Sequence, residues 1–199
     1  MTEYPIMEAF YTIQGEGRYT GHAAYFIRLG GCDVGCVWCD VKESWDATAH
    51  PNLSIDQILS QASEYPSKLI VITGGEPLMY DMNNLTSALK NKGFQLNIET
   101  SGAYPFSGQW DWVCFSPKKF MAPHESIYAQ ANELKVIIAH KSDFDFAVQH
   151  AQKVNKDCLL YLQVEWSKRE KLNPLLTEFV KSHPEWQLSI QSHKYLDIP

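Results

Sequence analysis

The sequence predicts an α/β protein whose mostly parallel sheet curves into an incomplete barrel. The first observation is that short apolar runs alternate with stretches of helical spacing. The second is that 68–73 is a continuous, largely β-branched run, typical of a strand buried on both faces. The third is that glycines and polar residues follow the expected strands, at the edge where α/β folds place their sites. About seven strands with few helices between some of them favour an open barrel over a closed eightfold one.

The expected elements follow in order along the chain. Expected strands cover 23–27, 68–73, 94–99, 112–115, 134–138, 159–163 and 186–191. One helix is expected to begin after the N-cap Ser54, and others cover 84–92, 144–154 and 172–181. No repeat, low-complexity tract or linker interrupts this pattern, so residues 1–199 are expected to form a single domain.

Composition limits the class of protein. The chain has 199 residues, 45% hydrophobic and 20% charged, values typical of a soluble globular protein with a sizeable core. Its net charge is −6 and no basic block stands out, which argues against a nucleic-acid partner. Neither a signal-peptide pattern nor a run of about 20 apolar residues is present. A cytoplasmic location without a membrane partner is therefore expected.

The stretch from Gly30 to Asp40 carries the strongest chemical signal. It places Cys32, Cys36 and Cys39 at spacing C-x3-C-x2-C directly after the first expected strand. Thiolates are suited to iron–sulfur clusters, and three of them would hold three irons of a cubic cluster. The fourth iron would be open to a substrate or cosubstrate.

Two other types of site are less compatible with these cysteines. A structural zinc site with His22 or His50 as fourth ligand is possible, but such sites usually combine two knuckles and the chain offers no second one. A disulfide framework is disfavoured because the number of cysteines is odd and no secretory signal is visible.

Two further features lie near this loop in the expected fold. In Gly74–Pro77, the glycines would let a ligand approach the backbone closely, and Glu76 could accept a hydrogen bond from an amine. Alone, this motif would be an ordinary β-turn. Asp40 either faces the site or closes an Asx-turn.

The segment 10–17 reads as a glycine-rich lead-in loop. Gln14 and Glu16 offer donors and acceptors that suit the edge of a heterocycle, although a plain hairpin loop is the simpler reading. Arg28 lies within the first expected strand, where a charge is costly unless it faces a site. Its guanidinium could clamp a substrate carboxylate.

The end of the sequence contributes His193 and Pro199. A lone histidine is more often structural than catalytic. The apolar residues Tyr195, Leu196 and Ile198 are expected to pack down, which would hold the Pro199 carboxylate in place as a binding group.

These stretches together resemble the 7-carboxy-7-deazaguanine synthase family of the radical S-adenosylmethionine (SAM) superfamily, over essentially the whole chain. The motifs that carry the resemblance are Gln14–Gly17, the cysteine loop with Trp38-Cys39-Asp40, Thr73–Pro77, Glu99–Gly102, Ser116–Lys118, Glu133–Lys135 and Gln191–Pro199. The resemblance implies a partial TIM-like barrel of the radical SAM type and a homodimer. It also implies an external electron donor, such as a flavodoxin-type reductant.

The implied reaction is the ring contraction of 6-carboxy-5,6,7,8-tetrahydropterin to 7-carboxy-7-deazaguanine with loss of ammonia, in queuosine biosynthesis. A [4Fe–4S] cluster would cleave SAM, and the resulting radical would take a hydrogen from the pterin. By the same resemblance, the residues that hold the cluster are Cys32, Cys36 and Cys39. Those that bind SAM are Trp38, Cys39, Asp40, Gly75, Glu76, Ser116, Pro117, Lys118 and Gln163. Those that bind the pterin are Ile13, Gln14, Gly15, Glu16, Arg28, Thr73, His193 and Pro199.

Two positions depart from the family pattern. Members with a Mg²⁺ site place a threonine after Cys-Asp, whereas Val41 offers no side-chain oxygen. Mg²⁺ dependence is therefore expected to be weak or absent, with the Lys42 ammonium as the positive charge near the substrate carboxylate. Val164 follows Gln163 where a proline is usual, so the SAM contacts beyond Gln163 are open.

Two alternative functions remain at this stage. A glycyl-radical activating enzyme of the same superfamily would need a surface for a large protein partner and leaves both ends of the chain unexplained. A structural zinc protein with a binding role would give a colourless preparation.

Overall fold

The computed structural model describes residues 2–199, and across them one open sheet organises the chain. Its nine strands run in the order β3-β1-β2-β4-β5-β6-β7-β8-β9. From β2 to β9 all neighbours are parallel, whereas β1 is antiparallel to both β2 and β3. The predicted incomplete, mostly parallel barrel is confirmed. The strands are β1 (Glu3–Ile13), β2 (Ala23–Leu29), β3 (Asn52–Ser54), β4 (Leu69–Gly74), β5 (Gln95–Thr100), β6 (Trp112–Phe115), β7 (Glu133–Ile138), β8 (Leu159–Val164) and β9 (Trp186–Leu188).

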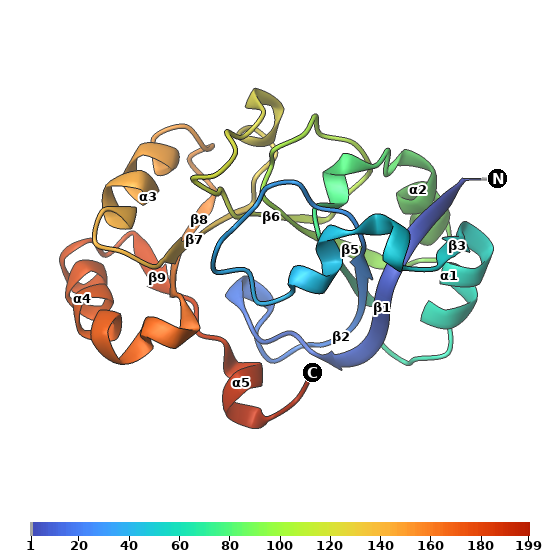
Figure 1. The fold of residues 1–199 in the computed structure, drawn as a ribbon, viewed down its shortest axis with the longest axis horizontal. Helices are drawn as coiled ribbons and strands as arrows, with labels where there is room; N and C mark the ends of the chain where they lie inside the picture. The colour runs from blue at the N-terminus through green and yellow to red at the C-terminus, as the bar shows by residue number, and fades with distance from the viewer. Residues whose placement is uncertain (1) are drawn as a thin grey trace.

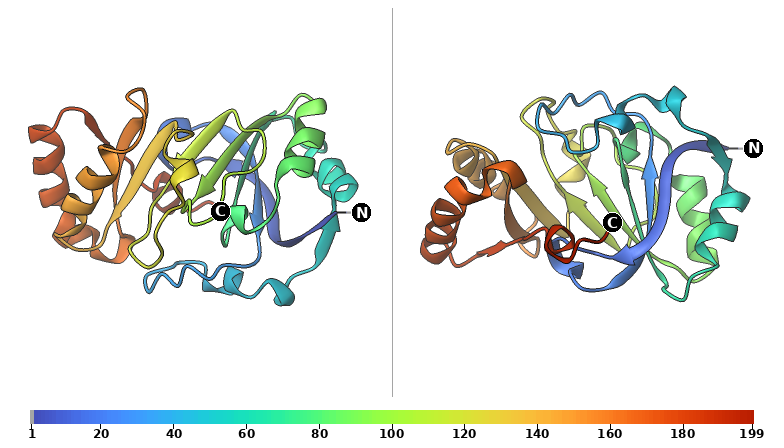
Figure 2. Two further views of the ribbon diagram at one scale, coloured as in Figure 1. Left: turned by 90° about the horizontal axis from the view of Figure 1, so that it is seen from above. Right: turned by 60° about the horizontal axis from the view of Figure 1, so that its bottom comes forward.

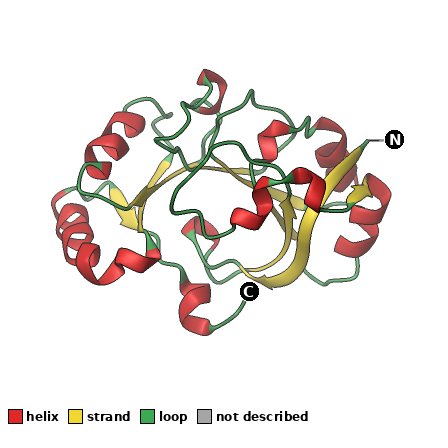
Figure 3. Cartoon of the chain, in the orientation of Figure 1, coloured by secondary structure: helices red, strands yellow, loops and turns green. Residues whose placement is uncertain are grey.

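The long helices lie on the outer side of the curved sheet (Figures 1 and 3). The α-helices are α1 (Ile55–Ala62), α2 (Asn83–Asn91), α3 (Asp143–Ala151), α4 (Arg169–Ser182) and α5 (Ser192–Leu196). Short 3₁₀ helices are η1 (Gly17–Tyr19), η2 (Lys42–Trp45), η3 (Ala47–Ala49), η4 (Pro77–Met79), η5 (Glu125–Ile127) and η6 (Trp166–Lys168). The loop after β2 crosses the inner side of the arc (Figure 1). Within residues 2–199, every helix is too short or too polar to cross a bilayer.

Local sequence explains where these elements begin. The predicted N-cap of α1 is confirmed: Gln57 N donates to Ser54 Oγ at 3.3 Å, and Ser54 N donates to Gln57 Oε1 at 2.8 Å. In β4, Ile70, Val71 and Ile72 are fully buried, as the β-branched run predicts.

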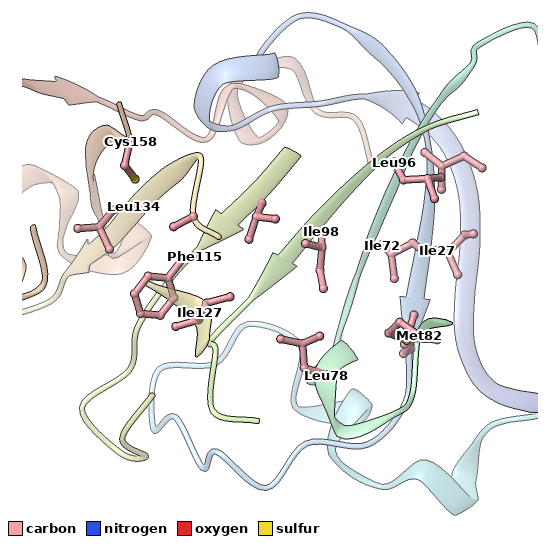
Figure 4. Close-up of a cluster of buried hydrophobic side chains, with 14 of the residues drawn as sticks. Ile27, Ile72, Leu78, Met82, Leu96, Ile98, Phe115, Ile127, Leu134 and Cys158 are labelled. Carbon is pink, nitrogen blue, oxygen red and sulfur yellow. The ribbon is translucent and has the colours of Figure 1, made fainter. Parts of the chain in front are cut away.

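The main hydrophobic core sets the register of the parallel strands. Ile27, Ile72 and Ile98, on β2, β4 and β5, are neighbours across the sheet and buried. Figure 4 shows them close to Leu78 and Met82, which lie just beyond the end of β4. Each such side chain stabilises the fold by about 1.5–3 kcal/mol through burial. Because the strands are locked in register here, their carboxyl ends reach one common edge.

The sequence prediction missed β1, the longest strand, and β3. It read 10–17 as a lead-in loop, whereas β1 extends to Ile13 and pairs with β2. Pro5 and an irregularity between Ile6 and Glu8 disturb the alternation that marks a strand.

The prediction for the end of the chain is partly wrong. The last strand stops at Leu188 rather than at 191, and a short helix, α5, follows. Leu196 is 59% exposed and does not pack down as expected, whereas Ile198 is half-buried and the Tyr195 ring, although 64% exposed, contacts Trp166 with ring centroids 5.0 Å apart. The segment is held through its polar groups instead: Ser192 N donates to Gly15 O at 3.0 Å. Figure 2 shows the C-terminus lying beside the N-terminal hairpin.

Candidate active site

A cavity of about 290 Å³ opens where the carboxyl ends of the parallel strands meet the cysteine loop. Nearly all of the residues predicted for the site line it, although Pro117 and Lys42 do not. The predicted residues in its wall are Ile13, Gln14, Gly15, Glu16, Arg28, Cys32, Cys36, Trp38, Cys39, Asp40, Val41, Thr73, Gly75, Glu76, Ser116, Lys118, Gln163, His193 and Pro199.

The cysteine loop presents three free thiols to this cavity. Cys36 is buried, and Cys32 and Cys39 are half-buried. A turn in which Cys39 N donates to Cys36 O at 3.0 Å brings the last two together. Burial raises the pKa of Cys36 to about 11, so binding iron there must displace a proton. The donor set fits a cubic iron–sulfur cluster in which three of the four irons each take one thiolate.

Position 75 requires glycine because the backbone of the cysteine loop lies close to it. A Cβ on this residue would lie 2.0 Å from Gly31 O, in the cysteine loop. Gly75 N donates to Leu29 O at 2.9 Å, and Glu76 N donates to Gly31 O at 2.8 Å. Backbone hydrogen bonds therefore hold the Gly-Gly-Glu-Pro motif against β2 and the start of the cysteine loop.

The Glu76 side chain links two strand ends. It is 1% exposed and accepts hydrogen bonds from Leu78 N at 3.0 Å, from Thr100 Oγ1 at 2.5 Å and from the backbone N and Oγ of Ser101. A carboxylate has about four acceptor positions, and these donors occupy them. The sequence analysis expected Glu76 to be free to accept a hydrogen bond from a ligand amine. In the structure, such an amine would have to displace one of these four donors.

Trp38, Ser116 and Lys118 come together as predicted. Lys118 Nζ donates to Ser116 O at 2.7 Å and to Ser116 Oγ at 2.6 Å, and it lies 5.7 Å from the centroid of the Trp38 ring. Burial lowers the pKa of Lys118. This group places a hydrogen-bond donor and an aromatic face beside the cysteines.

A buried ion-pair network forms another part of the wall. Lys135 Nζ, on β7, lies 2.5 Å from Glu16 Oε2 and 3.2 Å from Glu99 Oε2. Gln14 Nε2 donates to Glu99 Oε1, and Gln191 Nε2 donates to Glu16 Oε1, both at 2.9 Å. The network joins the N-terminal loop, β5, β7 and the C-terminal segment.

The charges in this network are mutually dependent. Burial alone would raise the pKa of Glu16, but the charge of Lys135 and hydrogen bonds from Lys135 and Gln191 lower it to about 2. Burial alone would lower the pKa of Lys135, yet the negative groups around it, including Glu16 and Glu99, raise it well above its usual value. Both groups are therefore charged at neutral pH.

Lys135 and Glu99 were not predicted as site residues. Both lie within motifs that carry the family resemblance. For Lys135 the available signal was a charge inside an otherwise apolar strand, where an unpaired charge is costly. Glu99 ends a strand that also contains Gln95 and Asn97, so it gave no such signal.

Arg28 and the C-terminal residues occupy the same cavity. Arg28 Nε donates to Glu8 Oε1 at 2.6 Å, which orients the guanidinium from its inner edge. Gly15 lies against His193, since a Cβ on Gly15 would come within 2.2 Å of His193 Nδ1. Burial lowers the pKa of His193, which favours the neutral imidazole. Thr12 Oγ1 donates to Pro199 O at 3.2 Å.

The structure places Lys194, rather than the predicted Lys42, in the cavity wall. Lys42 is exposed, with its Nζ 5.9 Å from the centroid of the Trp45 ring, outside the cavity wall. Lys194 lines the cavity instead, and its Nζ lies 3.3 Å from Asp40 Oδ2.

Comparison with known proteins identifies the family. A model of the radical SAM superfamily matches residues 26–113. The 7-carboxy-7-deazaguanine synthase of Flavobacterium psychrophilum is 58% identical over 195 residues, covering 98% of this chain and 92% of that protein. The synthase of the same name from Synechocystis is 49% identical, covering 98% and 93%. The crystal structure of QueE from Escherichia coli superposes with a TM-score of 0.85 at 32% identity, covering 95% of this chain and 94% of that one. The chain therefore belongs to the 7-carboxy-7-deazaguanine synthase family of radical SAM enzymes.

Proposed function

We propose that this enzyme converts 6-carboxy-5,6,7,8-tetrahydropterin into 7-carboxy-7-deazaguanine with release of ammonia, as a step of queuosine biosynthesis. The observation that carries the proposal is that a single cavity unites the cysteine loop, the Gly-Gly-Glu-Pro motif and the Glu16–Lys135 network. The family relationship supplies the chemistry. Neither a structural zinc protein nor a glycyl-radical activating enzyme accounts for that relationship over 98% of the chain.

Cys32, Cys36 and Cys39 would hold the cluster. When bound, the cluster and SAM supply the hydrogen-abstracting radical chemistry. The chain orients SAM through the backbone at Gly75 and through the Trp38–Lys118 group. The loop after β2 crosses the inner side of the arc (Figure 1), a position from which it would limit the entry of water.

The pterin's fused ring offers adjacent N–H donors on its pyrimidine edge. Glu16 suits that edge because its carboxylate stays ionised and is fixed by Lys135 and Gln191. Arg28 suits the substrate carboxylate, since Glu8 engages its Nε and leaves the two Nη groups for a bidentate contact. These contacts would hold the substrate at both ends.

Binding measurements on Glu16→Gln test this orientation. The variant keeps the side-chain shape but loses the charge that Lys135 and the pterin share. Its affinity for the pterin is expected to fall by about tenfold to a hundredfold, because a charge-assisted hydrogen bond is lost. Glu125→Gln, an exposed residue outside the cavity wall, is the control and should bind as the parent does. Equal affinity for the pterin in Glu16→Gln and Glu125→Gln would contradict the proposal that Glu16 binds the pyrimidine edge of the substrate.

We also propose that Mg²⁺ dependence is weak and that Lys194 supplies positive charge near Asp40. Val41 has no oxygen for the metal, and Lys194 lies in the cavity wall. Lys194→Ala should therefore become more dependent on added Mg²⁺ than the parent, whereas Lys42→Ala should behave like the parent. An equal response to Mg²⁺ in all three proteins would contradict the role of Lys194.

We propose further that the enzyme works as a homodimer reduced by an external, flavodoxin-type donor. The support for a dimer is apolar surface at the open β9 edge, where Leu188 and Ile190 are 44% and 57% exposed. Sedimentation equilibrium should give twice the chain mass. A monomer at micromolar concentration would contradict this assembly.

A further inference from the structure

A second, much smaller cavity lies behind the wall of the substrate site. Its volume is about 10 Å³, near the minimum for one water-sized ligand. Gln14, Glu16 and Glu99 line both cavities and so separate the two. The remaining polar groups in its wall include Asn97, Trp112 and Glu133.

Asn97 points to a ligand in this space. Its side chain is in the cavity wall, the residue is 4% exposed, and its Oδ1 is a buried acceptor without a hydrogen-bond partner among residues 2–199. A buried acceptor left unpaired costs about 1–3 kcal/mol. A small donor in the cavity would remove that cost.

The wall presents mostly acceptors to a ligand. It carries the carboxylates of Glu16, Glu99 and Glu133, and two of its donors are already engaged, while the Tyr19 hydroxyl, which accepts from Gln95 Nε2, keeps one O–H to donate. Trp112 Nε1 donates to Glu133 Oε2 at 3.0 Å, and Gln14 Nε2 donates to Glu99 Oε1. Lys135 balances only part of this negative charge. An ammonium ion has the size of water, four donors and a positive charge, so it matches the wall better than water does.

We infer that this cavity binds the ammonium ion formed from the nitrogen that the ring contraction expels. The inference rests on the proposed function. The product equals the substrate less the elements of ammonia, so no oxidant or reductant is consumed overall. The expelled ammonia takes one proton, from water or an acid in the site, to become ammonium. The cavity lies directly behind Glu16 and Glu99, on the far side of the substrate wall.

The test is ¹⁵N-ammonium titration of the oxidised, cluster-containing enzyme without substrate, followed by proton–nitrogen NMR. A bound ion should give a signal separate from that of free ammonium. Asn97→Leu removes the unpaired acceptor and should weaken binding at least tenfold. Asn97→Asp keeps the shape and adds charge, so it should bind at least as tightly as the parent. Asn173→Leu, an exposed change on α4, is the control and should keep the signal.

The outcomes separate this inference from the proposed function, because binding is measured without turnover. Absence of a bound signal, or an unchanged signal in Asn97→Leu, would overturn the ammonium site even if the enzyme makes 7-carboxy-7-deazaguanine. If Asn97→Leu fails to fold, loss of binding in the isosteric Asn97→Asp would overturn it. A bound signal in a protein that makes no product would instead contradict the proposed function.

Discussion

Lys135 and Glu16, 119 residues apart in the sequence, form an ion pair of 2.5 Å in which the lysine side chain is 4% exposed. Because Glu99 also contacts Lys135, one ammonium group holds two carboxylates of the substrate wall. Removing one partner of a buried pair leaves an uncompensated charge, which is much more costly than losing an exposed pair.

Lys135→Met should therefore destabilise the protein by about 3–5 kcal/mol and raise the KM for the pterin more than it lowers kcat. Urea unfolding and steady-state kinetics measure the two effects. Lys181→Met is the matched control, since the Lys181–Glu178 pair is exposed and should contribute less than about 1 kcal/mol. Equal losses in the two variants would contradict the role of the buried pair.

The pH dependence of stability should also report on Glu16. Its pKa in the folded protein is about 2, below the ordinary value of 4.5. A lowered carboxyl pKa stabilises the fold fully above the ordinary value, and this contribution is lost as the pH falls towards the folded value. The free energy of unfolding should therefore drop between about pH 5 and pH 2 in the parent. The drop should be smaller in Lys135→Met, and parallel pH curves for the two proteins would refute this assignment.

Gly75→Ala should disrupt the SAM site. The new methyl group would meet Gly31 O at 2.0 Å, so the cysteine loop must move. SAM affinity, measured by equilibrium dialysis, should fall by at least tenfold. Gly93→Ala is the control: its φ of +79° brings backbone strain, but nothing lies within 4 Å of the added atom. Both variants should lose stability, and only Gly75→Ala should lose SAM. Retained SAM binding in Gly75→Ala would contradict the claim that the close contact between position 75 and Gly31 O shapes the SAM site.

Iron loading should separate the site cysteines from those of the core. Cys32→Ala, Cys36→Ala and Cys39→Ala should each lose most of the bound iron and the brown colour after anaerobic reconstitution, because each removes one ligand. Cys158→Ala changes a buried thiol outside the cavity and should load iron normally. Normal iron content in any of the three site variants would contradict the cluster assignment.

Much of the parallel part of the fold could be predicted because its strands are apolar and β-branched. The run that became β4 is buried on both faces, and the Ser54 cap is local. In contrast, β1 pairs antiparallel with β2 through contacts that no local period encodes. The exposure of Leu196 likewise could not be predicted, because its segment is held by hydrogen bonds of neighbouring residues and not by its own hydrophobicity.

The site residues also fall into two groups: those recognisable from local sequence patterns and those that only the fold brings together. The cysteine spacing and the Gly-Gly-Glu-Pro motif are short-range patterns, so their residues could be named from the sequence. The pairing of Lys135 with Glu16 and Glu99 depends on which strands are neighbours, and the saturated bonding of Glu76 depends on Thr100 and Ser101 from the next strand. Likewise, only the fold shows that Lys194, rather than Lys42, lies near Asp40.

The most direct test of the account is anaerobic incubation of the reconstituted enzyme with SAM, dithionite and 6-carboxy-5,6,7,8-tetrahydropterin, read by mass spectrometry. The expected products are 7-carboxy-7-deazaguanine and an equal amount of ammonia, with little change in yield when Mg²⁺ is omitted. Formation of 5′-deoxyadenosine without the deazaguanine, in a protein that holds its iron, would contradict the assigned substrate.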